Sequence, residues 1–445
     1  MRDYLFFDFV FSNYAEYLLY CFFFCLTLFA LTKRTVGHFF DPFHFYYTFT
    51  FGTSYAVILI LYAHGFVNNI YFSYLVISGL IFLLSFLLIS KILYKNKAKG
   101  VFYRLNISIC NQERLILKIL VVLYFLCVIA YLSQVSLSSL IASRFEANKG
   151  IGFIVRIMDV LRLVLAAWFY LVFLNSGRKR YLIYVVAVSL IGAMLSGAKF
   201  AMLEQIFVIF TAAFILKRRS IKINIKTILI SIILAVVMFI FIFFLIQRMS
   251  ENIGYINSQY LPGMPVVFEL FLIRILANAD SYYLSLTENI LDVINVKMPL
   301  LQFFSNVFGN GLMSRLFGMD FANNDIGRQI WLYWYPADSI MRGPTAHFDI
   351  TGYVYLGYIG GILASAIVGV VLGTINSWKY RYYFAKPVTV AFVATVYCRS
   401  LPILLNPSVG IAYISDIFIL LFILLCCITL CKGAKYDSRS RNRDI

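Results

Sequence analysis

Long runs of apolar residues separated by short polar stretches dominate the hydrophobic pattern of this chain. A bilayer-spanning helix needs about 20 apolar residues, and windows of that length recur along most of the sequence. This pattern predicts an all-α fold, a polytopic membrane helical bundle with about 11 transmembrane helices. The expected spans are residues 14–32, 43–64, 70–93, 115–135, 153–175, 181–198, 200–216, 227–246, 349–375, 387–404 and 411–431.

One long segment, residues 247–348, interrupts this alternation of spans and short connections. It is rich in aromatic and apolar residues, and Pro265 to Ile294 has the pattern of one or two amphipathic helices. Long connections in compact proteins are usually functional or disordered, and this composition favours a folded cap. The expected organisation is a membrane bundle of spans 1–8 (1–246), the large loop (247–348), spans 9–11 (349–431) and a basic tail (432–445).

The distribution of charge predicts the topology. Only 13% of the residues are charged and 62% are hydrophobic, so a soluble domain is excluded. The net charge is +18, and 25 of the 38 Lys and Arg residues fall in connections that the positive-inside rule assigns to the cytoplasm. The large loop and the N-terminus are then outside, the C-terminus is inside, and nucleic-acid binding is not expected. The basic connections are 33–42, 91–118, 176–180, 217–226, 376–386 and 432–445.

Motifs for cofactors and metals are absent from the sequence. Most of the eight cysteines lie in or beside apolar spans and no CxxC occurs, which indicates small apolar side chains rather than disulfides or zinc ligands. The chain has no P-loop, DxD, GxSxG or HExxH motif. We therefore expect neither a metal nor a cofactor.

Three charged residues share one face of the fifth predicted span. Arg156, Asp159 and Arg162 follow one another at three-residue spacing, so Asp159 is expected to pair with one arginine and leave the other positive. One interpretation is a structural ion pair with a snorkelling arginine. The other is a cavity in which the arginine receives an anion, since its planar guanidinium binds phosphate bidentately.

Other basic residues lie on the outer side of the predicted bundle, where arginine is more frequent than lysine. Lys199 opens a span and either marks the membrane interface or binds a ligand, and Arg144 lies in a loop that is either solvated or a ligand contact. A pyrophosphate-bearing ligand would account for this excess of arginine. The further candidates are Arg328, Arg342 and Arg399.

His347 is the one histidine expected in the outer loop, at the point where the chain re-enters the membrane. A histidine is suited to general-base catalysis near neutral pH, and Asp349 is close enough in sequence to orient it. The alternative interpretation is a histidine that begins a helix and has no chemical role.

Two segments resemble the O-antigen polymerases of the Wzy type and, more distantly, the O-antigen ligases, both of the membrane glycosyltransferase C-like group. SGAKFAML, with Lys199, is similar to the small-residue turn before a basic residue in that family. GPTAHFDITGYVYLGYIGGIL, with His347, is similar to the segment that follows its periplasmic loop. The order of spans, large loop and three final spans also resembles the family.

The resemblance implies a reaction. In the periplasm, a glycan on undecaprenyl pyrophosphate is transferred to a hydroxyl of another lipid-linked repeat unit, without metal or nucleotide, during lipopolysaccharide biosynthesis at the bacterial inner membrane. It implies His347 as base, with Arg342 at the catalytic site and Arg162 and Lys199 on pyrophosphate. Implied partners are the lipid-linked oligosaccharide, membrane lipid and a chain-length regulator protein. Second-rank pyrophosphate contacts are Arg144, Arg328 and Arg399.

Two alternatives stay open at this point. An O-antigen ligase uses the same donor with a lipid A core acceptor, although ligases commonly have Asn where this chain has Phe348. A lipid-linked oligosaccharide flippase belongs to another class, and it predicts charges spread through central cavities and short loops on both sides.

Overall fold

The computed structural model describes residues 1–95, 113–135, 150–196, 201–217, 258–382 and 385–441, and these ranges contain helices and connections but no strand. This confirms a helical membrane bundle. Within the described residues, eight helices are long and apolar enough to cross a bilayer, and two shorter apolar helices, α10 (Arg180–Ser196) and α11 (Ala201–Lys217), lie at two further predicted spans. The predicted span 227–246 lies outside the described residues, so the count of eleven stays a prediction.

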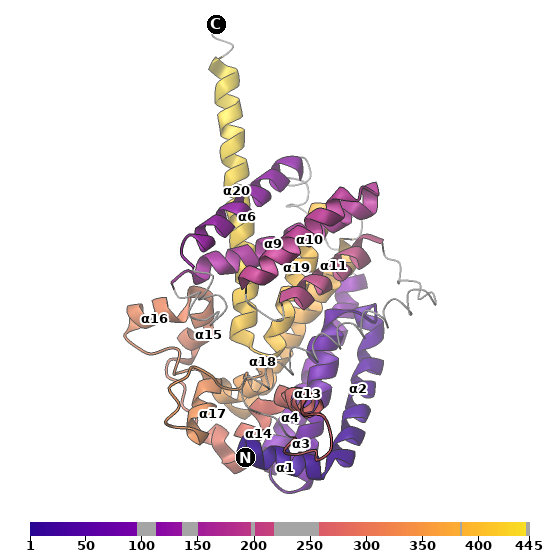
Figure 1. The fold of residues 1–445 in the computed structure, drawn as a ribbon, viewed down its shortest axis with the longest axis vertical. Helices are drawn as coiled ribbons and strands as arrows, with labels where there is room; N and C mark the ends of the chain where they lie inside the picture. The colour runs from indigo at the N-terminus through magenta and orange to yellow at the C-terminus, as the bar shows by residue number, and fades with distance from the viewer. Residues whose placement is uncertain (96–112, 136–149, 197–200, 218–257, 383–384, 442–445) are drawn as a thin grey trace.

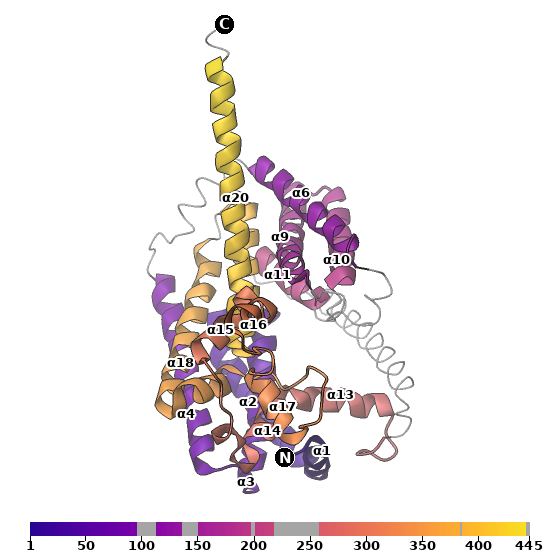
Figure 2. The same cartoon turned by 90° about the vertical axis from the view of Figure 1, so that its left-hand side faces the viewer.

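The long helices form two neighbouring groups (Figures 1 and 2). One group contains α2 (Tyr14–Val36), the π-helical segment η1 (His44–Phe49) with its continuation α3 (Thr50–Ala63), α4 (Asn69–Lys95) and α18 (Phe348–Arg381). The other contains α10 and α11 with α6 (Glu113–Leu132), α9 (Gly152–Ser176), α19 (Pro387–Ser400) and α20 (Pro407–Arg441).

Small residues allow α18 to pack closely on α4. Gly361, Ser365, Gly369 and Gly373 are spaced four apart and therefore lie on one face of α18. The Ser365 and Ser78 hydroxyls are 2.5 Å apart, and a Cβ added to Gly369 would lie 2.6 Å from the carbonyl oxygen of Phe82. Larger residues on this stripe would force the helices apart, as at other membrane helix interfaces rich in small residues.

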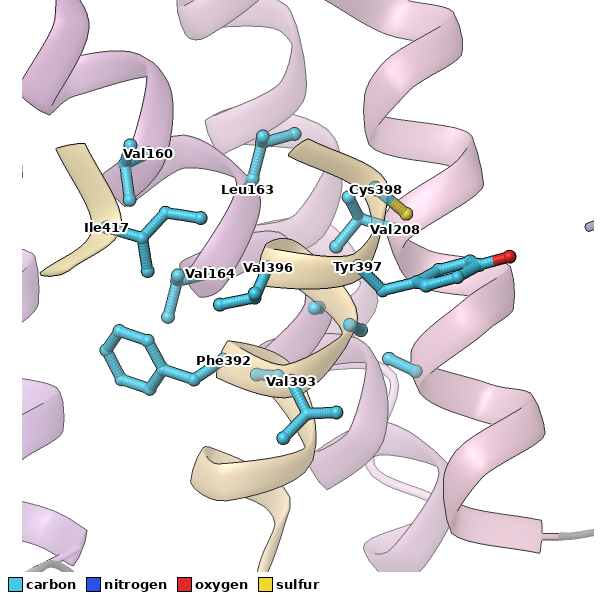
Figure 3. Close-up of a cluster of buried hydrophobic side chains, with 14 of the residues drawn as sticks. Val160, Leu163, Val164, Val208, Phe392, Val393, Val396, Tyr397, Cys398 and Ile417 are labelled. Carbon is cyan, nitrogen blue, oxygen red and sulfur yellow. The ribbon is translucent and has the colours of Figure 1, made fainter. Parts of the chain in front are cut away.

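Helix α19 is the most enclosed span and joins the second group together. Its side chains Phe392, Val393 and Val396 pack against α9, α11 and α20, and Figure 3 shows Val160, Val164 and Ile417 in the same cluster. Such an all-round apolar helix is typical of a position inside a bundle. Helices α2, α4 and α6 instead have many exposed apolar side chains, as expected for surfaces that face lipid.

Helix α18 is broken near its start, which the predicted continuous span 349–375 did not anticipate. Gly357 has φ +70° and ψ −170°, a conformation that only glycine adopts readily. The nine residues before it form a short helix that folds back, so that a Cβ on Gly352 would lie 3.1 Å from the Cα of Gly361. Irregular backbone at membrane depth requires protein or water around it, and here Tyr74 lies against the bend.

The described part of the segment 247–348 consists of short helices, and we call these helices the cap. The stretch expected to hold one or two amphipathic helices contains α13 and α14 with two 3₁₀ turns. In order, the cap elements are α13 (Val266–Leu276), η2 (Ala277–Ala279), α14 (Asp280–Ser285), η3 (Thr287–Asp292), α15 (Pro299–Phe308), α16 (Asn310–Phe317) and α17 (Ile326–Trp334).

The N-terminal helix α1 (Asp3–Ser12) packs on this cap. Phe6 stacks on Tyr283 with ring centroids 3.8 Å apart, and the Tyr283 hydroxyl donates a 2.8 Å hydrogen bond to Asp3. α1 and the cap helices α13, α14 and α17 therefore lie at the same end of the molecule, while the C-terminal end of α20 extends from the opposite end (Figure 1). The topology expected from charge requires the same separation of the two termini.

Candidate functional site

His347 lies where the cap meets the membrane bundle. It is the N-cap residue of α18, its side chain makes no capping hydrogen bond, and only 3% of its surface is exposed. Its ring packs against Phe51 of α3 and against Tyr282 of α14, with centroid distances of 5.0 and 5.1 Å. Three elements distant in sequence therefore position this histidine.

A hydrogen-bonded chain connects His347 to Asp349. His347 Nδ1 is 3.0 Å from the Tyr282 hydroxyl, and that hydroxyl donates to both carboxylate oxygens of Asp349, at 3.0 and 2.8 Å. Asp349 is fully buried, and the backbone N–H of Ile350 donates to it at 2.8 Å. The expected orientation of His347 by Asp349 is thus indirect, because Tyr282 lies between them.

The protonation of the His347 ring follows from the geometry of these hydrogen bonds. Because the Tyr282 hydroxyl donates to the carboxylate, it accepts from His347, so Nδ1 carries the proton and Nε2 has the free lone pair. Burial lowers the pKa of His347 to about 3, so that the ring is neutral at physiological pH. We name this group of side chains, His347, Tyr282 and Asp349, the histidine cluster.

A second buried group lies among α9, α11 and α19. Arg162 is 1% exposed, and its guanidinium lies 3.3 Å from Asp159 and 3.3 Å from Glu204. It also donates a 2.7 Å hydrogen bond to the carbonyl of Ala201. Arg399, equally buried, lies 2.9 Å from Glu204 and 3.9 Å from Asp159. We name these two arginines and two carboxylates the arginine cluster.

The expectation of an unpaired positive charge on α9 was wrong. Arg156 pairs with Asp416 of α20 at 2.5 Å, and it also donates to the carbonyls of Asn306 and Val307 at the end of α15. Asp159 therefore forms its ion pairs with Arg162 and Arg399 instead. Asp416 could not be matched to Arg156 from spacing, because the two lie 260 residues apart in sequence.

The helix formed by η1 and α3 neighbours both clusters. Tyr46 of this helix has Glu204 and Arg399 as electrostatic neighbours, and Phe51 contacts His347. Both clusters therefore lie against the continuous helix formed by η1 and α3.

The two loop arginines have different surroundings. Arg328 is buried, and its guanidinium donates to the carbonyls of Ile340, Arg342 and Asp338 at 2.7, 3.3 and 2.5 Å. It therefore holds the irregular segment that carries Arg342. The Arg342 side chain is 56% exposed, lies 2.6 Å from Asp338 and covers the ring of Trp331. Of these two arginines, Arg342 is the one open to an incoming anion.

Two predicted site residues, Lys199 and Arg144, lie outside the described residues. The structure brings Arg162 and Arg399 together in the arginine cluster, and it positions His347 beside Asp349 through Tyr282. Sequence reasoning missed Tyr282 and Asp416. Asp416 had a detectable signal, because a lone carboxylate inside an apolar span usually has a partner, whereas Tyr282 is one of 32 tyrosines and had none.

Comparison with known proteins gives no family for this chain. No protein-family model, no curated protein and no solved structure matches it.

Proposed function

We propose that this chain is a metal-independent glycosyltransferase that polymerises undecaprenyl-pyrophosphate-linked O-antigen repeat units on the periplasmic side of the bacterial inner membrane. The observation that carries the proposal is the histidine cluster, a neutral buried imidazole whose Nδ1 is engaged through Tyr282, which leaves the lone pair on Nε2. This arrangement suits removal of a proton from a hydroxyl, the step that an acceptor sugar requires. The resemblance of residues 343–363 to O-antigen polymerases supports the same reaction.

In the proposed step, the acceptor hydroxyl oxygen forms a bond to the anomeric carbon of the donor glycan. The bond from that carbon to the pyrophosphate oxygen breaks, and undecaprenyl pyrophosphate leaves with the bonding electron pair. The acceptor proton passes to Nε2 of His347. As the ring becomes positive, the Asp349 carboxylate stabilises it through Tyr282, which resembles the role of the carboxylate in a catalytic triad. The negative pyrophosphate also raises the basicity of a nearby histidine.

Arg342 is proposed as the first contact of the pyrophosphate because its guanidinium is exposed, whereas Arg328 positions the turn beneath it. Arg162 and Arg399 already share Asp159 and Glu204, so they stabilise an anion only to the extent that these carboxylates do not cancel their charge. We assign them a secondary role. Lys199 and Arg144 keep the pyrophosphate role that the resemblance implies.

A flippase or other transporter of lipid-linked oligosaccharide is the second candidate. The broken helix α18 and the buried charges of α9, α11 and α19 favour it, since discontinuous helices and central charges are typical of transporters. The folded cap favours the polymerase.

The lipopolysaccharide banding pattern of a strain lacking the chain tests the proposal. Loss of a polymerase leaves the lipid A core bearing a single repeat unit. Loss of a ligase leaves bare core and accumulates lipid-linked polymer, and loss of a flippase leaves bare core with single lipid-linked units. Full-length ladders in this strain would exclude the polymerase.

Complementation of the same strain tests the site. His347→Ala should restore no long chains while the protein is still expressed in the membrane. His64→Ala is the matched control. His64 is an exposed histidine at the C-terminal end of α3, where it pairs with Glu16, whereas His347 contacts Phe51 near the start of α3. A ladder of wild-type length with His347→Ala would show that His347 is not the base.

A further inference from the structure

The cap helices α15 and α16 have an unusual exposed surface. In α15, Leu300, Phe304 and Phe308 are spaced four apart and share one face, with exposed fractions of 72%, 38% and 60%. In α16, Leu312 and Leu316 repeat the spacing and are 52% and 67% exposed. We name these five side chains the apolar stripe.

The polarity of α15 is the reverse of that of a helix on a water-exposed surface. Its buried residues are polar: Gln302 donates a 3.0 Å hydrogen bond to the carbonyl of Phe321, and the Ser305 hydroxyl donates to its own helix. Three of its large apolar side chains, Leu300, Phe304 and Phe308, point outward instead. A helix in contact with water buries its apolar face. This inversion is expected where the surroundings of the helix are themselves apolar.

The stripe is adjacent to the surface of a membrane span. α15 packs along α20, where the Ser408 hydroxyl donates to the carbonyl of Phe303 at 2.5 Å and Asn306 donates to Ser408 at 2.9 Å. Further along α20, Phe418 and Phe422 are exposed, four residues apart, as a lipid-facing surface requires. The apolar stripe therefore lies on a helix that packs against a span with an exposed apolar surface of its own.

The ends of the stripe are basic. Lys297 precedes α15 and Arg315 lies in the last turn of α16, and both are exposed. Basic residues beside an exposed apolar face are typical of helices that lie in a membrane interface and contact anionic headgroups. The five side chains of the stripe itself carry no charge.

We propose that α15 and α16 form an in-plane membrane anchor, with the apolar stripe inserted among the acyl chains and with Lys297 and Arg315 at the level of anionic phospholipid headgroups. The anchor fixes the cap against the bilayer beside α20. This inference does not depend on the proposed enzymatic activity.

Nitroxide labels at single cysteines test the anchor in the full-length chain. The eight native cysteines are first replaced, and the protein is reconstituted in nanodiscs of phosphatidylcholine and phosphatidylglycerol. Labels at Leu300, Leu312 and Leu316 should collide several-fold more with oxygen, which concentrates in the bilayer, than with a water-soluble nickel chelate. A label at Asp320, an exposed polar position just after α16, is the matched control and should show the reverse preference.

Two results would overturn the proposal. Stripe labels with the same nickel preference as the Asp320 control would mean that the stripe lies in water. Labels protected from both reagents, with spin–spin broadening that disappears on dilution with unlabelled protein, would mean that a second copy of the chain covers it. The charges are tested separately, since Lys297→Gln with Arg315→Gln should make oxygen access at Leu312 independent of phosphatidylglycerol.

Discussion

The histidine cluster and the arginine cluster are both buried, but they differ in how their charges are balanced. In the arginine cluster, two guanidinium groups lie within 4 Å of two carboxylates, so that positive and negative charges cancel. In the histidine cluster, Asp349 has hydrogen bonds from Tyr282 and a backbone N–H, and its neighbour His347 is neutral.

This difference in charge balance predicts different roles for the two clusters. A compensated group of charges resists change, because removing any member leaves a buried charge without its partner. A carboxylate held next to a neutral imidazole can instead stabilise a proton that arrives on that imidazole. We therefore expect substitutions in the arginine cluster to affect mainly stability, and substitutions in the histidine cluster to affect mainly turnover.

The largest effect is expected for Glu204→Gln. The change leaves Arg162 and Arg399 to share Asp159, and loss of one partner from a buried charge pair costs about 3–5 kcal/mol. Thermal unfolding of the purified protein in detergent should show a large decrease in Tm. The exposed pair Glu16–His64 provides the matched control, and Glu16→Gln should leave Tm close to that of the wild type.

A double variant tests whether the charges of the arginine cluster are coupled. Glu204→Gln combined with Arg399→Gln removes one charge of each sign and should recover much of the lost stability, because the remaining Arg162 keeps Asp159. If Glu204→Gln is as stable as wild type, the cluster is solvated in the membrane and its charges are not coupled.

Tyr282→Phe tests the histidine cluster. It keeps the ring but removes the hydroxyl that links His347 to Asp349, and a hydrogen bond to a charged group contributes about 1.5–3 kcal/mol. Transfer of glycan between purified lipid-linked repeat units should therefore slow by roughly ten- to a hundredfold. Tyr283→Phe is the control, since its hydroxyl also donates to a carboxylate, that of Asp3, away from His347. Equal rates for both variants would contradict a role for the chain of hydrogen bonds.

The pH dependence of stability tests the burial of His347. Its pKa is lowered from 6.5 to about 3, so the folded protein resists a proton that the unfolded chain binds. Stability should consequently decrease as pH falls from about 6.5 towards 3, with a contribution of about 2 kcal/mol at pH 5. Tm measured at pH 7 and pH 5 should fall less in His347→Gln than in wild type.

Much of the fold follows from local sequence, because the length and hydrophobicity of a span are properties of one segment. The pair Asp159–Arg162 was predictable for the same reason, since it depends on spacing within one helix. The partners Arg156 and Asp416 come from different helices, and no local rule connects them.

The positive-inside rule does not predict which lysines of a basic connection are buried. Lys379 lies in a basic connection that was expected to be cytoplasmic, yet its side chain is fully buried and lies 2.6 Å from Asp41. The Tyr397 hydroxyl donates to the same carboxylate at 2.5 Å. A count of lysines along the chain predicts which side of the membrane a connection occupies, but not whether one of those lysines folds inward.

The smallest effect on stability is expected for Arg342→Ala, and this variant distinguishes a ligand contact from a structural residue. Arg342 is largely exposed and its pair with Asp338 lies at the surface, so the change should cost less than about 1 kcal/mol. If Arg342 contacts the pyrophosphate, long glycan chains should nevertheless disappear from the complemented strain while Tm stays near wild type. Arg342→Lys should recover them only in part, because lysine lacks the planar fork that binds phosphate bidentately. If Arg342→Ala still gives ladders of wild-type length, Arg342 does not bind the pyrophosphate, and the arginine cluster becomes the candidate for that role.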